Sequence, residues 1–429
     1  MNTEKCLTVA VAGMGSRGWT YALCSEKYPE KMRVVAAADI RPDRLAMAKE
    51  RFGIAQDRLF ASAEEMLAQP KLADIMVIST QDRQHVPMAV AAMKKGYHLI
   101  LEKPISPEPE ECAQVLRVAE ETGRKVIVCH VLRYTPFYGK LKELLCGGAV
   151  GEIVAAQHVE NVVYWHQAHS FVRGNWRRSD ETSPMILAKC CHDFDLLLWL
   201  AGKHGKAVSS YGGTYLFKPE KAPEGAAARC LDGCRAKENC PYDAEKIYIT
   251  NAATGVANGK TEWPCDVLAN QPTVENIRQA IETGPYGRCV YACDNDVVDH
   301  QMVNIECTDG ATLSLCMSAF TSRGGRDTKI MGTRGEIVAN LSENTICVMP
   351  FGGEKTVIDV SALAEDFSGH AGGDVRMVEE FLDMVSGRSG PTVRTTSLRD
   401  SVESHFAALA AEKSRLEGGR SVALSEVTG

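Results

Sequence analysis

Three short groups of residues in this chain of 429 residues have side chains and spacings that suit chemistry on an alcohol. One apolar run ends in Gly13-Met14-Gly15-Ser16-Arg17-Gly18, another ends in Glu102-Lys103-Pro104, and His192 begins an apolar helical stretch. A glycine turn of this spacing holds the pyrophosphate of a dinucleotide, whereas lysine and histidine can hold or accept a hydroxyl proton. Together they predict hydride transfer between a dinucleotide and an alcohol.

The glycine turn stands between a strand and a helix, which is the context that gives it meaning. Gly13 allows a tight turn, Gly15 lets the backbone approach the pyrophosphate, and Gly18 lets the helix pack against the strand. The free N–H groups at the start of that helix would face the phosphates. We expect the cofactor to contact Gly13, Gly15, Ser16, Arg17, Gly18, Asp39, Ile40, Arg41, Thr80, His85, Glu102 and Lys103.

Asp39 follows the second strand, about twenty residues after the glycines, where a carboxylate can accept hydrogen bonds from the ribose hydroxyls. Its charge repels the 2'-phosphate of NADP, so NAD is the expected cofactor and NADP is disfavoured. Arg41 and Arg44 leave an alternative open, because either could turn towards a phosphate instead of lying in solvent at a helix start.

Lys103 and His192 are the candidate groups for the proton of the reacting hydroxyl. Pro104 restricts the direction of Lys103 at a strand end, and burial beside an oxidised nicotinamide favours a neutral amine. His192 suits a general base or a substrate donor, because imidazole changes charge near neutral pH. The alternatives are a lysine paired with Glu102 for structure alone and a histidine packed in the core.

Residues 164–178 combine tryptophans, histidines and arginines, which offer flat apolar faces and directional donors for a sugar ring. A packed interface loop is the alternative explanation. Residues elsewhere that could join the substrate are Arg133, just after the last strand of the first domain, and His370, which a helix-capping turn explains equally well. The expected substrate contacts are Arg133, His166, His169, Arg173, Trp176 and His370.

Residues 218–295 are rich in Cys, Pro and Gly and resemble an insertion with little apolar core of its own. Cys230, Cys234 and Cys240 lie within eleven residues there, and clustered thiols in a reducing compartment favour metal binding over disulfides. We expect structural zinc or an iron–sulfur cluster, against an equal expectation of free cysteines. The fourth ligand would come from Cys265, Cys289 or Cys293.

Strands and helices alternate in the first part of the chain. Near-continuous apolar strands at 7–12, 34–38, 75–79, 98–101 and 125–129 alternate with helices at 16–27, 43–52, 85–95 and 110–122. Such strands need cover on both faces. Residues 1–130 are therefore predicted to form an α/β, doubly wound parallel Rossmann sheet.

Residues 131–429 follow a different pattern, in which short strand-like runs are separated by glycine or polar turns. The runs are 152–163, 301–307, 311–319, 328–331, 336–339 and 345–349, with helices at 192–200, 374–385 and 398–416. This pattern predicts an α+β domain with a mostly antiparallel sheet, in which substrate binding and subunit contacts would lie.

Composition limits the class of protein. Apolar content is 45% and charged content 24%, which is typical of a soluble globular protein. The net charge of -7 argues against a general nucleic-acid surface, and no apolar run approaches the length of a membrane span. Without a signal-peptide pattern at its start, the chain is expected to be cytoplasmic, with its 16 cysteines mostly reduced.

The order of the glycine turn, Asp39, Glu102-Lys103-Pro104 and Cys190-Cys191-His192-Asp193-Phe194-Asp195 resembles the Gfo/Idh/MocA family over nearly the whole chain. The resemblance implies a Rossmann domain followed by an open-faced sheet domain, NAD or NADP as cofactor, and Lys103 and His192 beside the nicotinamide. The family usually has an aspartate four residues before the histidine, where this chain has Ala188. Lys189 would replace that group as a second base or anchor, or would form a structural ion pair.

These observations predict an NAD(H)-dependent oxidoreductase that acts on a ring hydroxyl of a sugar, glycoside or cyclitol. An alternative is a glycoside hydrolase that oxidises its sugar only transiently, as some relatives of the Gfo/Idh/MocA family do. A third is a nucleotide-sensing binding protein, which would have no use for Lys103. The open sheet face implied by the resemblance predicts a homo-oligomer, a dimer or a tetramer.

Overall fold

The computed structural model describes residues 6–363 and 368–428, and the first part of the chain forms a parallel sheet. The strand order is β3-β2-β1-β4-β5-β6, and every neighbouring pair is parallel. The bounds are β1 Leu7–Ala12, β2 Met32–Ala38, β3 Leu59–Phe60, β4 Ile75–Ile78, β5 His98–Leu101 and β6 Val126–Val128. The order reverses between β1 and β4, so the predicted glycine turn lies at the switch point where such sheets bind ligands.

Helices cover both faces of this sheet, as its buried apolar strands require. They are α1 Ser16–Lys27, α2 Pro42–Phe52, α3 Ala63–Ala68, α4 His85–Lys94 and α5 Pro109–Thr122. The predicted doubly wound fold is thereby confirmed. A sixth helix, α13 Gly373–Ser386, comes from the far end of the chain and packs Met377 and Phe381 into the same core as Val9 and Val11.

The second sheet has nine strands in the order β14-β13-β12-β11-β7-β10-β9-β8-β15. Its bounds are β7 Ile153–Val163, β8 Gly205–Gly213, β9 His300–Cys307, β10 Thr312–Thr321, β11 Gly325–Gly332, β12 Gly335–Asn340, β13 Thr345–Pro350, β14 Thr356–Asp359 and β15 Val422–Ala423. Its pairs are antiparallel except β7 with β10, which confirms the predicted mostly antiparallel sheet. The strands β8, β14 and β15 were not predicted.

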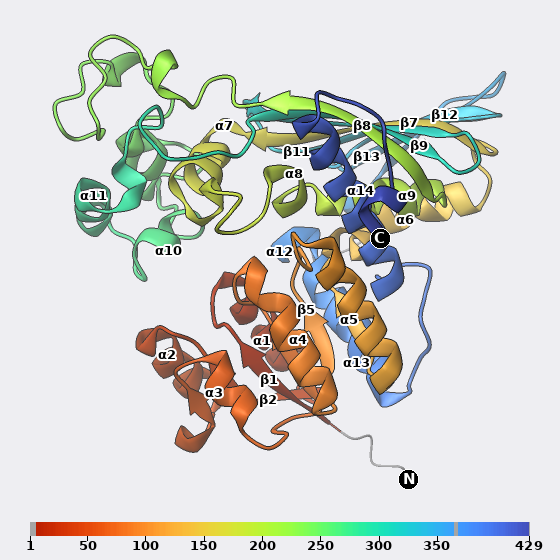
Figure 1. Ribbon diagram of the computed structural model, residues 1–429, viewed down its shortest axis with the longest axis horizontal. Coiled ribbons are helices and arrows are strands. Elements are labelled where there is room, and N and C mark those ends of the chain that lie inside the picture. Colours follow the sequence, from red (N-terminus) through yellow and green to blue (C-terminus); the bar gives the residue numbers. More distant parts are fainter. Residues whose placement is uncertain (1–5, 364–367, 429) are drawn as a thin grey trace.

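One face of the second sheet is covered by helices that lie between it and the Rossmann domain (Figure 1). These are α6 Pro136–Cys146, α8 Met185–Ala188, α9 Cys191–Ala201 and α14 Leu398–Leu416. The opposite face carries exposed apolar side chains, including Val154, Met302 and Val338. Within the described part of the chain, no helix is long and apolar enough to cross a membrane.

The insertion projects from one end of the second sheet, at the left in Figure 1, and contains α10 Cys265–Leu268 and α11 Val274–Thr283. It packs against the segment that follows β7, which comprises α7 Tyr164–His166 and a π-helical turn at Gln167–Arg173. Tyr248, Ile277 and Ile281 are fully buried there in one apolar cluster. The prediction that this insertion has little apolar core is therefore wrong.

Candidate functional site

The glycine turn has the geometry that its sequence predicts. Gly13 has a φ of +92°, and a Cβ there would lie 2.6 Å from the Ser79 carbonyl oxygen. A Cβ at Gly18 would lie 1.9 Å from the carbonyl oxygen of Gly13, so the protein itself requires both glycines. A Cβ at Gly15 would meet only Arg44, at 3.6 Å. Because Gly15 is not required by close packing, its free space fits the approach of a pyrophosphate to the start of α1.

Asp39 is buried and is oriented by the backbone at the end of β2. Its Oδ2 accepts a hydrogen bond from the Met14 N–H at 2.8 Å, and its Oδ1 accepts one from the Arg41 N–H at 2.8 Å. Arg44 lies 3.4 Å away from Oδ2, while Arg41 pairs with Asp43 and with Asn270 of the insertion. Ile40 beside it is 84% exposed. The carboxylate thus lies beside the glycine turn, where a ribose would be held.

Arg17 takes part in a partly buried ion-pair network and is not a free phosphate-binding group. Its Nε lies 2.6 Å from Glu102, and its guanidinium also contacts Tyr21 and, at 2.5 Å, Asp374. Burial alone would raise the pKa of Glu102, but the charges of Arg17 and Lys103 hold it below its usual value. His370, predicted as a substrate contact, joins this network through Asp374, at 3.0 Å. The network ties α1 and α13 to the segment after β5.

Lys103 connects the Rossmann domain to α8 of the second domain at the predicted reaction centre. Its Nζ donates a hydrogen bond to the carbonyl oxygen of Ala188, at 3.0 Å, immediately before the segment that carries His192. Its backbone N–H donates to Glu102 at 2.9 Å. His85 contacts the carbonyl oxygens of Pro104, at 2.7 Å, and Thr80, at 3.2 Å. His85 therefore positions the Glu-Lys-Pro segment.

Lys189 has a carboxylate partner that the sequence did not indicate. Its Nζ lies 3.3 Å from Glu160 on β7, and Glu160 lies 2.8 Å from Arg326 on β11. Arg326 in turn pairs with Asp193 at 2.6 Å, and Asp193 contacts His158 at 2.9 Å. Of the two predicted roles for Lys189, this continuous buried network favours the structural ion pair.

His192 is buried at the start of α9 and lies near two other histidines. The centre of its ring is 5.7 Å from that of His130, just after β6, and 6.3 Å from that of His370. Burial, together with the charge of Lys103, lowers the pKa of His192 well below its usual value. His192 is therefore a neutral imidazole with a ring nitrogen that can accept a proton.

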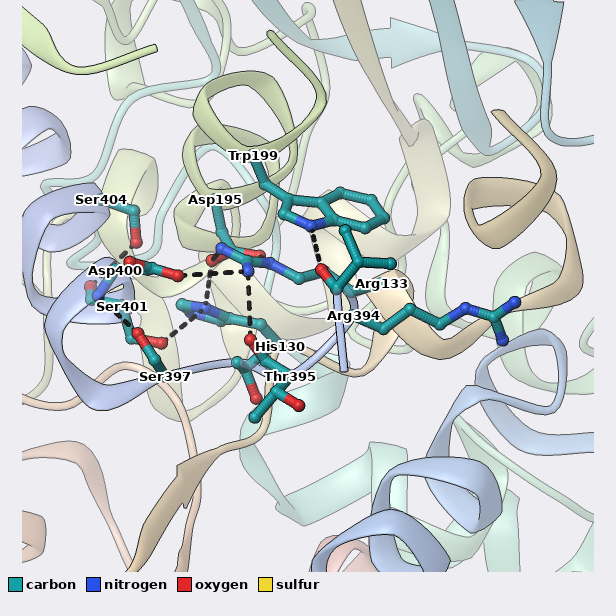
Figure 2. A network of polar contacts seen from close by, with 12 residues as sticks. His130, Arg133, Asp195, Trp199, Arg394, Thr395, Ser397, Asp400, Ser401 and Ser404 are labelled. Carbon is teal, nitrogen blue, oxygen red and sulfur yellow. Dashed lines mark hydrogen bonds and ion pairs between the residues drawn. The ribbon is translucent and has the colours of Figure 1, made fainter. Parts of the chain in front are cut away.

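A second network on α9 is drawn in Figure 2. Arg133 donates two hydrogen bonds to Asp195, at 2.7 and 2.6 Å, and lies over the ring of Trp199. His130 lies 3.0 Å from the same carboxylate. Arg133, predicted as a substrate contact, is buried and occupied in this pair. Its observed partners therefore favour a role in holding α9 beside the Rossmann domain.

The predicted substrate segment divides into an aromatic group and a buried group. The ring of His166 lies 4.7 Å from that of Trp263, and the two tryptophans, Trp165 and Trp263, lie 5.3 Å apart. His169 is buried, stacks on Tyr286 and contacts the hydroxyl of Tyr248 at 2.9 Å. Burial lowers the pKa of His169 to about 3. His166 is the more open of the two histidines.

Two other predicted substrate residues have partners elsewhere. Arg173 is 1% exposed and donates hydrogen bonds to the carbonyl oxygens of Arg288 and Tyr242 within the insertion. Trp176 donates to Asp82 at 3.4 Å, after β4, and so links the two domains. These contacts favour structural roles for both side chains.

The cysteines of the insertion converge without forming a metal site. Cys230, Cys234, Cys240 and Cys289 line one small cavity beside Arg173. Burial raises the pKa of the Cys230 and Cys240 thiols. Among residues 6–363 and 368–428, no group of three His, Cys, Asp or Glu side chains is arranged to hold a metal ion. The arrangement gives the predicted zinc or iron–sulfur cluster no support.

Sequence reasoning missed four residues of this junction: Glu160, His130, Trp263 and Asn270. His130 comes two residues after the end of β6, and a polar residue at the carboxyl end of a parallel strand was a signal that could have identified it. The other three come close to the site only through strand pairing or through the fold of the insertion, which no local pattern indicates.

Comparison with known proteins agrees with this architecture. Residues 7–130 match the Gfo/Idh/MocA model described as "Oxidoreductase family, NAD-binding Rossmann fold". Residues 142–424 match the companion model, "Oxidoreductase family, C-terminal alpha/beta domain".

Individual relatives are distant. The Bacillus subtilis (strain 168) protein YteT, an oxidoreductase by name, is 24% identical over 393 residues, which cover 87% of each chain. The 2,7-anhydro-N-acetylneuraminate hydratase of Escherichia coli (strain K12) is 25% identical over 152 residues, 35% of this chain and 40% of that protein. The structure of scyllo-inositol dehydrogenase from Lactobacillus casei, with NAD(H) and scyllo-inositol, aligns with a TM-score of 0.65 at 16% identity, covering 98% of this chain and 100% of that one.

Proposed function

Because the chain belongs to the Gfo/Idh/MocA family of NAD-binding oxidoreductases, we propose that it transfers a hydride to or from a ring hydroxyl carbon of a sugar, glycoside or cyclitol. The observation that carries this proposal is the contact of Lys103 with the carbonyl oxygen of Ala188, at 3.0 Å. It brings a lysine of the Rossmann domain against the segment that leads to His192. A hydroxyl placed there would meet both side chains.

The glycine turn and Asp39 are the residues that would hold the cofactor, with NAD preferred over NADP because the negative charge of Asp39 repels a 2'-phosphate. Bound NAD supplies the hydride acceptor or donor. His192, which is neutral near pH 7, would take the hydroxyl proton at its ring nitrogen. Lys103 would donate a hydrogen bond to the developing alkoxide. Lys189 would remain paired with Glu160 and contribute positive charge rather than accept the proton.

The aromatic group supports a ring-shaped polar substrate. Trp165, Trp263 and His166 offer apolar ring faces on the side of the insertion, and Trp263 is 38% exposed. Sugars and cyclitols combine apolar C–H faces with hydroxyl groups, so such rings give packing while His166 gives a hydrogen bond. His370, at 6.3 Å from His192 between ring centres, would reach the same substrate from α12 Ser368–Ala371.

The test is a redox balance. The full-length protein is incubated with free NAD and a panel of cyclitols, hexoses and nitrophenyl glycosides, and NADH and products are both quantified. We expect NADH and ketone in equal amounts from at least one cyclitol or sugar. Lys103→Met should lower turnover about 100-fold while leaving NAD affinity nearly unchanged. Absence of NADH with every polyol would contradict the proposal.

The likeness to a hydratase favours one second candidate, a redox-neutral reaction on a glycoside. Oxidation at one ring carbon would acidify the neighbouring C–H, and a base such as His192 would then permit elimination of the glycosidic group. In heavy water this path would place deuterium on that neighbouring carbon and give glycoside cleavage without net NADH. The same panel therefore separates the two candidates.

The uncovered face of the second sheet supports a homo-oligomer. Exposed positions alternate with core positions along β7, β9 and β12, and Val154, Met302 and Val338 are 52%, 53% and 43% exposed. Apolar side chains gathered on one sheet face favour burial against a second copy. Light scattering should report a dimer or tetramer, and Met302→Glu with Val338→Lys should shift it towards monomer. A monomeric parent protein would contradict this part of the proposal.

A further inference from the structure

Two buried ring nitrogens at the junction lack hydrogen-bond partners among the described residues. They are Nε2 of His130 and Nδ1 of His192, and they belong to neighbouring rings that meet edge-on with centres 5.7 Å apart. A buried nitrogen without a partner is costly, and native proteins rarely leave one unexplained. Both atoms would gain a partner if one bridging water molecule, or a small rotation of either ring, joined them by a hydrogen bond.

The partners of His130 indicate which tautomer it adopts. Its Nδ1 lies 3.0 Å from Asp195, a carboxylate that also accepts two hydrogen bonds from Arg133. Burial alone would raise the pKa of Asp195, but Arg133 and His130 lower it to about 2, so it stays ionised. An ionised carboxylate can only accept, and Nδ1 of His130 therefore carries the proton. Its Nε2 is then a lone-pair acceptor.

We infer that His130 is a positioning residue for His192. With the two atoms joined in this way, Nε2 of His130 would accept the Nδ1–H of His192 and keep the lone pair of His192 on Nε2, where a hydroxyl proton would be received. A proton taken up by His192 would be stabilised by the Asp195 carboxylate through the His130 ring. No group needs to change its oxidation state or leave the protein in this step. The inference rests on the proposed function only for its kinetic consequence.

This relay also accounts for Ala188, at the position where the resembling family usually carries an aspartate. In this chain a carboxylate would act on His192 from three residues further along α9, with one imidazole between them. His130 can make this connection because its side chain reaches α9 from the Rossmann domain, where it follows β6.

Other groups face the pair and belong in any interpretation of its pH dependence. His192 interacts with Lys103, Arg326 and His370 in addition to His130. On its other side His130 stacks on His405 of α14, with ring centres 5.6 Å apart, and His405 accepts a hydrogen bond from the Ile105 N–H at 2.8 Å. Its remaining nitrogen lies 2.6 Å from the Ser401 carbonyl oxygen. His405 is thus already satisfied and does not compete for the free nitrogen of His130.

The first experiment reads the tautomer of His192 without using activity. Protein labelled with ¹⁵N-histidine is examined near pH 7.5 by two-bond proton–nitrogen correlation, with His192 assigned through a His192→Gln variant. We expect the Nδ1–H form in the parent protein and its loss in His130→Phe. His158→Phe is the matched control, because His158 is also buried and pairs with a carboxylate of α9. It should leave the His192 signals unchanged.

The second experiment is kinetic. His130→Phe should lower kcat at least about 10-fold with KM for cofactor and substrate nearly unchanged, and should shift the acid limb of the kcat profile. His130→Gln, whose carboxamide oxygen can accept from His192, should recover part of the rate.

An Nε2–H tautomer of His192 in the parent protein, or signals that do not respond to His130→Phe, would overturn the inference whatever the enzyme's substrate. Failure of every polyol to yield NADH, with the tautomer as expected, would instead contradict only the proposed function.

Discussion

The two aspartates of α9 begin two networks of similar composition that end differently. Asp193 contacts His158 and Arg326, and the network continues through Glu160 to Lys189. Asp195 contacts His130 and Arg133, and the network continues towards His192. Each has a buried carboxylate, histidine and arginine, yet one ends at a paired lysine and the other at a histidine with an unpaired nitrogen.

The difference distinguishes a network that stabilises the fold from one that can handle a proton. In the Asp193 network both ring nitrogens of His158 have partners, Thr328 at 2.7 Å and Asp193 at 2.9 Å, and the ammonium of Lys189 has Glu160. A buried network whose charged groups are all ion-paired and whose histidine has partners at both ring nitrogens holds one arrangement and offers no imidazole lone pair to a substrate. In the Asp195 network one nitrogen on each of two histidines is free. We therefore assign stability to the first and proton handling to the second.

Removing the carboxylate of the Asp193 network should have the largest effect on stability. Asp193→Ala leaves Arg326 buried with one carboxylate instead of two, and breaking such a buried pair typically costs about 3–5 kcal/mol. Denaturant unfolding of the variant should show this loss as a lower midpoint at unchanged slope. A loss below about 1 kcal/mol would mean that the network is not a stabilising element and would remove the contrast with Asp195.

The two candidate bases should differ strongly in kinetics. His192→Gln should lower kcat about 100-fold or more, because it removes the proton acceptor. Lys189→Met should lower kcat less than about 10-fold, since the lysine is already paired, although substrate KM can rise. Steady-state kinetics of both variants with the same polyol decide the matter. Equal losses would assign proton chemistry to both networks.

Acid should weaken both networks, whereas both should be intact at neutral pH. The folded-state pKa of Asp195 is about 2, below its ordinary value of 3.8, because Arg133 and His130 outweigh burial; that of Asp193 is lowered by Arg326 and His158. Stability from a lowered carboxylate pKa is complete above the unfolded value and is lost as pH falls through the folded one. For Asp195 the loss is about 2 kcal/mol between roughly pH 5 and pH 2. Urea midpoints across that range, in parent and Asp195→Asn, test it: the variant should show a weaker pH dependence.

A carboxylate that faces a ligand instead of a protein partner should behave differently from both aspartates of α9. Among the described residues, Asp39 accepts hydrogen bonds from two backbone N–H groups and, at 3.4 Å, from Arg44. Asp39→Ala should weaken NADH binding about 10-fold, or roughly 1.4 kcal/mol, with a smaller change in unfolding free energy. Calorimetric titration of NADH measures the first and denaturation the second. Unchanged NADH affinity would show that Asp39 does not hold the ribose.

Local signals account for what could be predicted from the sequence. The strand Leu7–Ala12 and the helix Ser16–Lys27 have the predicted bounds, because an apolar run, a glycine turn and a helix start lie next to one another in sequence. The strand β8, Gly205–Gly213, escaped prediction because its glycines and serines give weak alternation, and it forms by pairing with β9. Glu160 was missed as the partner of Lys189 because the two residues lie in different elements and meet only in the folded domain.

Helices from the end of the chain, α13 and α14, complete the core of the sheet that is synthesised first. Residues 377–382 supply buried side chains to the core around Val9 and Val11, and Leu398 and Val402 of α14 pack into the core on the other side of the same sheet. The first sheet to leave the ribosome therefore waits for some of the last residues before its apolar faces are closed. A fragment ending near residue 130 would expose those faces to solvent, so we expect the Rossmann part to need the C-terminal helices in order to fold stably.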